Sequence, residues 1–150
     1  MSTISVLVWN DEKDFRSIMD QAVIQYYRRL LKTGFKHTGS IENPSIFLDT
    51  VSEKIPICGS ITDYLHLYIN VKKGKIETIK YLCTCDPTTN VAVEILCVLI
   101  QGKTTEEIKT ITDDSFFKIL ESRSEEIGKK AKGLIELLSR GLDRLIKKPA

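Results

Sequence analysis

The sequence has almost no net charge and no apolar run of membrane-spanning length. Its 22 lysines and arginines are offset by 20 acidic residues, which leaves +2, too little to favour nucleic acid as a partner. The longest apolar stretch, residues 91–100, is interrupted by Glu94 and is far shorter than the ~20 residues that cross a bilayer. Residues 1–10 show no basic and apolar secretory leader. We therefore expect a cytoplasmic protein that binds neither a membrane nor nucleic acid.

Catalytic motifs are also scarce. The chain has only two histidines and no nucleophile-elbow pattern of glycines, so a hydrolytic triad is not indicated. The stretch Gly102-Lys103-Thr104 is not a phosphate-binding loop, because Cys97 occupies the place of its first glycine and a predicted helix precedes it. The sequence therefore gives no support to conventional hydrolytic catalysis.

The four cysteines are the most informative residues. Thiols stay reduced in the cytosol, so they do not indicate a disulfide framework. Cys97 lies among apolar residues of a predicted helix and is expected in the core. Cys58, Cys83 and Cys85 stand on either side of a predicted hairpin. A thiol at a strand end or helix N-terminus loses its proton readily and binds metal or sulfur, so these residues predict a metal- or sulfur-handling site.

The composition is that of an ordinary globular protein, with 42% hydrophobic and 28% charged residues. The chain shows no internal repeat and no low-complexity tract. Its 150 residues are enough to enclose one substantial core. We expect a single domain over residues 1–150.

The first part of the chain predicts one long helix and one long connection. Apolar residues at helical spacing predict a helix over about residues 12–32, which Gly34 ends. The short apolar run at residues 4–8 is a candidate strand. Residues 33–60 are punctuated by glycine and proline and predict an irregular connection that leads to Cys58. A connection of this length inside a domain usually has a function.

The second part predicts a hairpin followed by helices. Alternating apolar residues predict strands over 64–71 and 76–83, joined by a turn at 72–75. Asp86 followed by Pro87 is typical of a helix start, and this helix is expected to run to about residue 101.

Capping signals predict three further helices. The first is a short one with a capping box at Thr104. The second lies around residues 116–120 and starts at Asp113 or Asp114. The third is long, is capped by Ser122 with Glu125, and has an apolar face made of Ile127, Ala131, Leu134, Leu138, Leu142 and Leu145.

These elements predict an α+β fold. We expect a small antiparallel sheet of three strands or so, with helices packed on one face and a long C-terminal helix. The third strand is expected from residues 47–55 or 4–8.

Three short stretches of the sequence are informative when their order and spacing are considered together. Residues 57–60 read Ile-Cys-Gly-Ser, residues 74–76 read Gly-Lys-Ile, and residues 99–107 read Leu-Ile-Gln-Gly-Lys-Thr-Thr-Glu-Glu. Together they resemble the Cys-Gly-Asp segment, the hairpin turn and the Gly-Lys-Thr-Leu-Glu-Glu stretch of IscU/NifU-type iron–sulfur cluster assembly scaffolds. The likeness covers about residues 15–147.

The chain also departs from the family pattern. Ser60 stands where the family has Asp, and Asp86 stands at the second-cysteine position, with Cys85 one residue earlier. Glu126 stands at the third-cysteine position, and the family's Leu-Pro-Pro-Val-Lys chaperone-docking segment has no counterpart before Arg123. The chain therefore resembles a divergent member of the family, and no dedicated chaperone is implied.

The predicted site combines these residues at one end of the sheet. The resemblance implies Cys58 and Cys85 as ligands of the cofactor, and the wider set of candidate metal ligands is Cys58, Cys83, Cys85, Asp86 and Glu126. Three of these residues also have a possible structural role. Cys83 can fill the core, Asp86 can cap a helix and Glu126 can interact favourably with a helix dipole.

The two histidines are weaker candidates. His66 lies on a predicted strand and is expected at the surface. His37 lies in the same predicted connection as Cys58, which gives it a route to the site.

Three functions remain open from the sequence. The resemblance implies a protein that is not an enzyme but a scaffold or carrier that binds an iron–sulfur cluster, iron or sulfur, with a cysteine desulfurase and apo iron–sulfur proteins as partners. A degenerate member that binds zinc in a structural or regulatory role is the first alternative, because a carboxylate beside thiolates favours zinc over a cluster. A thiol-based sulfur relay through Cys85 is the second.

Overall fold

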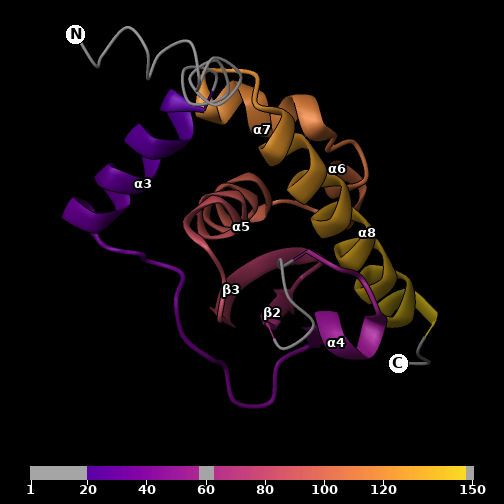
Figure 1. Ribbon diagram of the computed structural model, residues 1–150. Helices are drawn as coiled ribbons and strands as arrows, with labels where there is room; N and C mark the ends of the chain where they lie inside the picture. The colour runs from indigo at the N-terminus through magenta and orange to yellow at the C-terminus, as the bar shows by residue number, and fades with distance from the viewer. Residues whose placement is uncertain (1–19, 58–62, 148–150) are drawn as a thin grey trace, which may run out of the picture.

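The structure, a computed structural model, describes residues 20–57 and 63–147 (Figure 1). In chain order its elements are α3 (Gln21–Thr33), β1 (Ile46–Asp49), α4 (Thr50–Glu53), β2 (Leu65–Lys72), β3 (Lys75–Cys83), α5 (Pro87–Ile100), α6 (Thr105–Ile108), α7 (Asp113–Leu120) and α8 (Glu125–Lys147).

The sheet is antiparallel in the order β1-β2-β3. The β2–β3 hairpin is registered by pairs from Leu65 opposite Cys83 to Lys72 opposite Lys75. Its turn residues, Lys73 and Gly74, have φ values of 55° and 76°. Two successive positive φ values match the right-handed twist of the strands. Gly74 adopts its value without strain because glycine has no Cβ.

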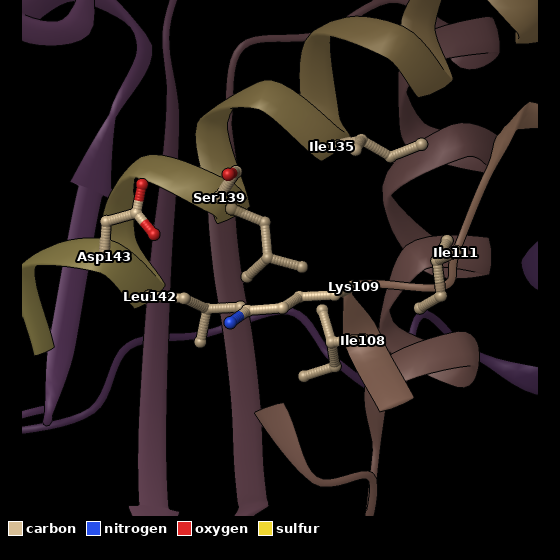
Figure 2. A pocket seen from close by; sticks show the side chains of 8 residues that line it. Ile108, Lys109, Ile111, Ile135, Ser139, Leu142 and Asp143 are labelled. Atoms are coloured by element: carbon tan, nitrogen blue, oxygen red, sulfur yellow. The ribbon is translucent and has the colours of Figure 1, made fainter. Parts of the chain in front are cut away.

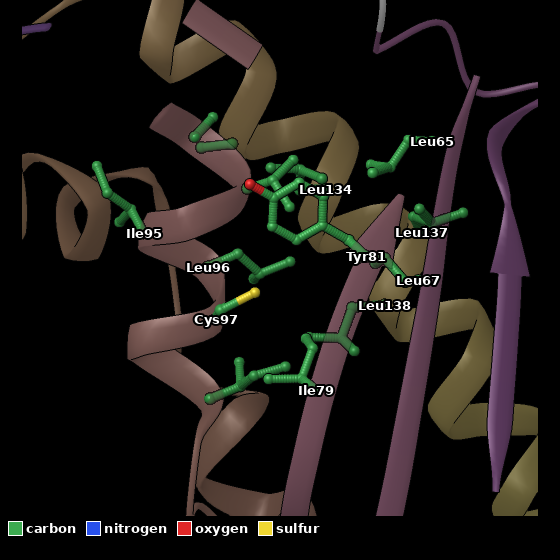
Figure 3. Packing of buried hydrophobic residues seen from close by; sticks show 14 of the residues in the cluster. Leu65, Leu67, Ile79, Tyr81, Ile95, Leu96, Cys97, Leu134, Leu137 and Leu138 are labelled. Carbon is green, nitrogen blue, oxygen red and sulfur yellow. The ribbon is translucent and has the colours of Figure 1, made fainter. Parts of the chain in front are cut away.

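Helices cover one face of the sheet. In Figure 1, α5 lies between the strands and an arch formed by α3, α7 and α8. Every residue of α5 from Val91 to Cys97 is buried, which explains why this segment is apolar except at Glu94. Leu96 and Cys97 of α5 point toward Tyr81 and Ile79 of β3, whereas Ile95 points away from the sheet (Figure 3).

The other face of the sheet carries an aromatic cluster. The rings of Phe47, His66 and Tyr68 have centroids 5.2 to 6.5 Å apart. His66 also lies 3.4 Å from the carboxylate of Asp49. This face is therefore separate from the helical core.

Helix α8 approaches the edge of the sheet closely at its glycines. A Cβ on Gly141 would lie 2.9 Å from side-chain atoms of Ile46 and Leu48, and a Cβ on Gly133 would lie 2.9 Å from Ile57. Glycine at these positions lets α8 pack directly against β1 and against the segment that follows α4. The position of that segment determines where the chain enters residues 58–62.

The predicted fold class is confirmed, with three antiparallel strands, helices on one face and a long C-terminal helix. The buried face of α8 contains the predicted residues Ile127, Ala131, Leu134, Leu138 and Leu142. No helix in the described part of the chain combines the length and apolarity needed to cross a membrane. The predicted strand at residues 4–8 and the start of the predicted helix 12–32 lie outside the described residues.

Two predicted boundaries are wrong. The third strand begins one residue before the predicted 47–55 segment and stops at Asp49, whose side chain accepts the N–H of Val51 at 3.1 Å and starts α4. Residues 33–60 therefore contain regular structure. Helix α8 is capped by Ser124, not Ser122, because the Ser124 hydroxyl accepts the N–H of Ile127 at 3.3 Å.

Candidate ligand site at the end of the hairpin

The strand-to-helix junction at the end of the hairpin has a fixed geometry. Strand β3 ends at Cys83, and after residues 84–86 the chain enters α5. The Asp86 side chain accepts the N–H of Thr89 at 2.8 Å, and Pro87 is the first helical residue. The predicted N-cap is confirmed. Asp86 itself is exposed, so one carboxylate oxygen caps the helix at the edge of the solvent.

The two thiols at this junction are half-buried and have different neighbours. The Cys83 thiol donates to Asn90 Oδ1 at 3.2 Å, and the Cys85 Sγ lies 3.8 Å from the carbonyl oxygen of Tyr64. Both side chains pack against the edge of the core. They are therefore neither deep core fillers nor fully exposed.

Both flanks of residues 58–62 are anchored by hydrogen bonds, one of them to this junction. On one flank, the Lys130 ammonium of α8 donates to the carbonyl oxygen of Ile57. On the other, Tyr64 and Thr84 exchange two hydrogen bonds of 3.0 Å each, one backbone and one through the Thr84 hydroxyl. The predicted ligand Cys58 follows Ile57 directly but lies outside the described residues.

The positive charge of Lys130 also acts on the Asp86 carboxylate. Burial tends to raise the pKa of Asp86, but the N–H of Thr89 and the charge of Lys130 outweigh it, so the pKa lies below its ordinary value. The carboxylate is therefore ionised at neutral pH. Cys97 has the opposite environment, because burial and the nearby Glu94 charge raise the pKa of its thiol well above the usual range. Cys97 is buried in the core, as predicted.

Glu126 lies in the first turn of α8. Its side chain is exposed, and its carboxylate lies 3.9 Å from the ammonium of Lys129. Among the described residues, no group of three or more histidine, cysteine, aspartate or glutamate side chains is arranged to hold a metal ion. The thiols of Cys83 and Cys85 suit a soft metal by their chemistry. The predicted metal site stays a prediction.

A buried polar cluster was missed by the sequence analysis. Glu94 is only 2% exposed, and its two carboxylate oxygens each lie 2.9 Å from a partner, Nδ1 of His37 and the hydroxyl of Tyr81. His37 thus lies against α5, where its ring contacts the Glu94 carboxylate. A lone glutamate inside the apolar run 91–100 was the signal, since buried carboxylates require partners.

Two hollows lie near these elements. One, of about 240 Å³, is lined by Tyr27, Phe35, Thr38, Tyr81, Leu82, Cys83 and Asn90. The other, of about 120 Å³, lies between α6 and α8, where Ile108 and Ile111 face Leu142 and Ile135 (Figure 2). The second hollow has no thiol or histidine in its lining, so only the first bears on the candidate site.

Comparison with known proteins supports the fold. No family model and no curated protein sequence matches the chain. The structure is similar to that of a NifU-like protein (N-terminal) from Brucella abortus, with a TM-score of 0.59 and 10% identity over 90% of this chain and 99% of that one. A protein described only as hypothetical matches with a TM-score of 0.50 and 16% identity, over 86% of this chain and 99% of that one. At these identities the likeness is one of fold.

Proposed function

We propose that this protein is a non-enzymatic, single-domain scaffold or carrier that binds an iron–sulfur cluster, iron or sulfur through Cys58 and Cys85. The observation that carries the proposal is the anchoring of both flanks of residues 58–62, one by Lys130 of α8 and the other by Thr84 of the Cys85–Asp86 junction. The NifU-like fold of the Brucella abortus protein supports the same reading.

The anchoring fixes the point at which the chain enters residues 58–62. Consecutive Cα atoms are ~3.8 Å apart, so Cys58 stays within one residue of the Ile57 carbonyl that Lys130 binds. Lys130 in turn is close enough to Asp86 to lower the pKa of its carboxyl group. Thiolates bound to one zinc or iron lie ~2.3 Å from it, so we expect the Cys58 and Cys85 sulfurs within ~4 Å of each other in the loaded protein.

The other predicted ligands are secondary in this proposal. Cys83 is two residues from Cys85, but its thiol donates to Asn90. Asp86 has a carboxylate oxygen that does not cap the helix. Glu126 precedes Lys130 by one turn of α8 and so shares its face of the helix. These side chains are candidates to complete the coordination around the two principal thiols.

The proposed partners follow from the resemblance. A cysteine desulfurase would supply sulfur, and apo iron–sulfur proteins would receive the cargo. A reducing cytoplasm would keep the thiols available for this exchange.

Zinc binding in a structural or regulatory role is the second candidate function. The observation that favours it is the ionised Asp86 carboxylate beside Cys85, because zinc accepts carboxylate ligands more readily than a sulfide cluster does. A sulfur relay through Cys85 would need no metal.

Variants at three positions test the proposal. Cys58→Ala is expected to abolish loading with iron and sulfide under anaerobic conditions, and Cys97→Ala is the matched control that removes a thiol away from the site. Asp86→Cys restores a cysteine at the family's second position and is expected to increase cluster retention. If neither Cys58→Ala nor Asp86→Cys changes iron, sulfide or sulfur content, the scaffold function is refuted.

A further inference from the structure

The chain between α3 and β1 crosses the open edge of β3. Residues 34–39, here called the strap, follow α3 and pass beside β3 (Figure 1). The Tyr81 N–H donates to the His37 carbonyl at 2.9 Å, and the Gly39 N–H donates to the Tyr81 carbonyl at 2.8 Å. The Lys80 ammonium donates to the Lys36 carbonyl at 3.1 Å. The strap therefore adds a short parallel bridge to the sheet.

The strap is held to the core by polar contacts and one ring contact. None of its six described residues belongs to the buried apolar core. Phe35 is half-buried and lies against Tyr27, with ring centroids 5.7 Å apart. A segment with so little apolar burial opens locally at a lower free-energy cost than the strands and helices beneath it.

His37 is the strap residue that reaches the buried cluster. Its side chain is 21% exposed, whereas that of its partner Glu94 is 3% exposed. Glu94 binds His37 through one oxygen and Tyr81 through the other, so the cluster joins the strap to both α5 and β3. The carboxylate also acts on Tyr26 of α3 and Cys97 of α5, whose pKa values its charge helps to raise. A hydrogen bond to a buried charge contributes more than an ordinary one.

The strap forms part of the wall of the larger hollow. Phe35 and Thr38 of the strap line this space together with Tyr27 of α3, and Cys83 and Asn90 also line it. The hydrogen bonds of the strap to β3 lie on the edge that is not paired with β2, so breaking them leaves the β2–β3 ladder intact.

We propose that the strap is a gate over the hollow that contains Cys83, and that the buried His37–Glu94–Tyr81 cluster is the latch that keeps it closed. Reagents reach Cys83 when the strap opens, while the core stays folded. The proposal does not depend on what the site carries, because it concerns access to a thiol and not the loading of a metal or sulfur.

Site-resolved alkylation by iodoacetamide tests the latch. Each cysteine of the full chain is followed separately by mass spectrometry in the wild type, in His37→Ala and in His66→Ala. His66 is the matched control, because it is the other histidine of the chain and also pairs with a carboxylate, on the opposite face of the sheet.

The latch predicts a selective change. His37→Ala is expected to increase the alkylation rate of Cys83 by roughly tenfold, the change expected from losing a hydrogen bond to a charged group, and to leave Cys97 unchanged. His66→Ala is expected to change neither rate. An unchanged Cys83 rate in His37→Ala overturns the gate. Equal acceleration at Cys83 and Cys97 also overturns it, since that pattern reports general destabilisation.

A measurement on the wild type covers the case in which His37→Ala does not fold. The Gly39 amide, which bonds to the Tyr81 carbonyl, is expected to exchange its hydrogen at least tenfold faster than the most protected amides of the β2–β3 ladder. Exchange of Gly39 as slow as that of those amides contradicts local opening of the strap.

Discussion

Replacement of Asp86 separates its structural role from any role as a ligand. The carboxylate accepts the Thr89 N–H at 2.8 Å, and the backbone at Asp86 is extended, with φ −71° and ψ 168°, as an N-cap requires. Asp86→Ala removes the acceptor and is expected to lower the free energy of unfolding by ~1 kcal/mol. For a chain of this length, this corresponds to a fall of roughly 3 °C in the melting temperature.

Asp86→Asn is the matched control because it keeps an oxygen acceptor and removes only the charge. We expect it to lose a few tenths of a kcal/mol, from the helix dipole and the charge of Lys130. The folded protein holds the pKa of Asp86 below its ordinary value of 3.8. The stability that the Asp86 charge contributes is therefore fully present at pH values above 3.8 and is lost as the pH falls through the lower pKa of the folded state.

Urea unfolding of the wild type and both variants, from neutral to acid pH, measures these effects. The wild type and Asp86→Asn are expected to converge at acid pH, while Asp86→Ala remains less stable than both. If Asp86→Ala equals the wild type at neutral pH, the capping role is wrong. If Asp86→Asn loses as much stability as Asp86→Ala, the charge and not the hydrogen bond dominates, which also contradicts the reasoning.

Two further predictions concern packing and thiol reactivity. Gly141→Ala is expected to lower the free energy of unfolding by about 1–2 kcal/mol, measured by urea unfolding. The added Cβ would lie 2.9 Å from side-chain atoms of Ile46 and Leu48, and this clash outweighs the better helix propensity of alanine. An increase in stability would show that α8 can shift away from β1. Cys85 is expected to alkylate faster than Cys97 at neutral pH, because burial and Glu94 raise the pKa of the Cys97 thiol; equal rates would mean that Cys85 is inert.

The parts of the fold that depend on local chemistry could be predicted from the sequence. The start of α5 follows from Asp86 and Pro87, because a cap and its first helical residue are neighbours in the chain. The hairpin follows from two alternating runs around a turn at Gly74. The buried face of α8 follows from apolar residues at helical spacing.

The parts that depend on distant contacts could not be predicted. Strand β1 is only four residues long and is defined by its pairing with β2. Ser124 donates to Asp20, which is 104 positions away, and no local pattern distinguishes it from Ser122 as the cap of α8. The partnership of His37 with Glu94 spans 57 positions.

The candidate site also has one part that could be predicted from the sequence and one part that could not. The motif at residues 83–86 is contiguous, so the sequence alone could predict a thiol pair before a helix start. The role of Lys130 was not visible, because its contact with Ile57 joins α8 to a segment far earlier in the chain. That contact links the entry to residues 58–62 with the Asp86 junction.

Anaerobic purification of the full wild-type chain, followed by analysis of metal and acid-labile sulfide, tests the central claim most directly. The proposed scaffold function predicts protein-bound iron, with sulfide in a comparable amount where the cargo is a cluster, and a loss of the cluster on exposure to air. Zinc without sulfide, or neither metal nor sulfide after incubation with iron and a sulfur source, would contradict it.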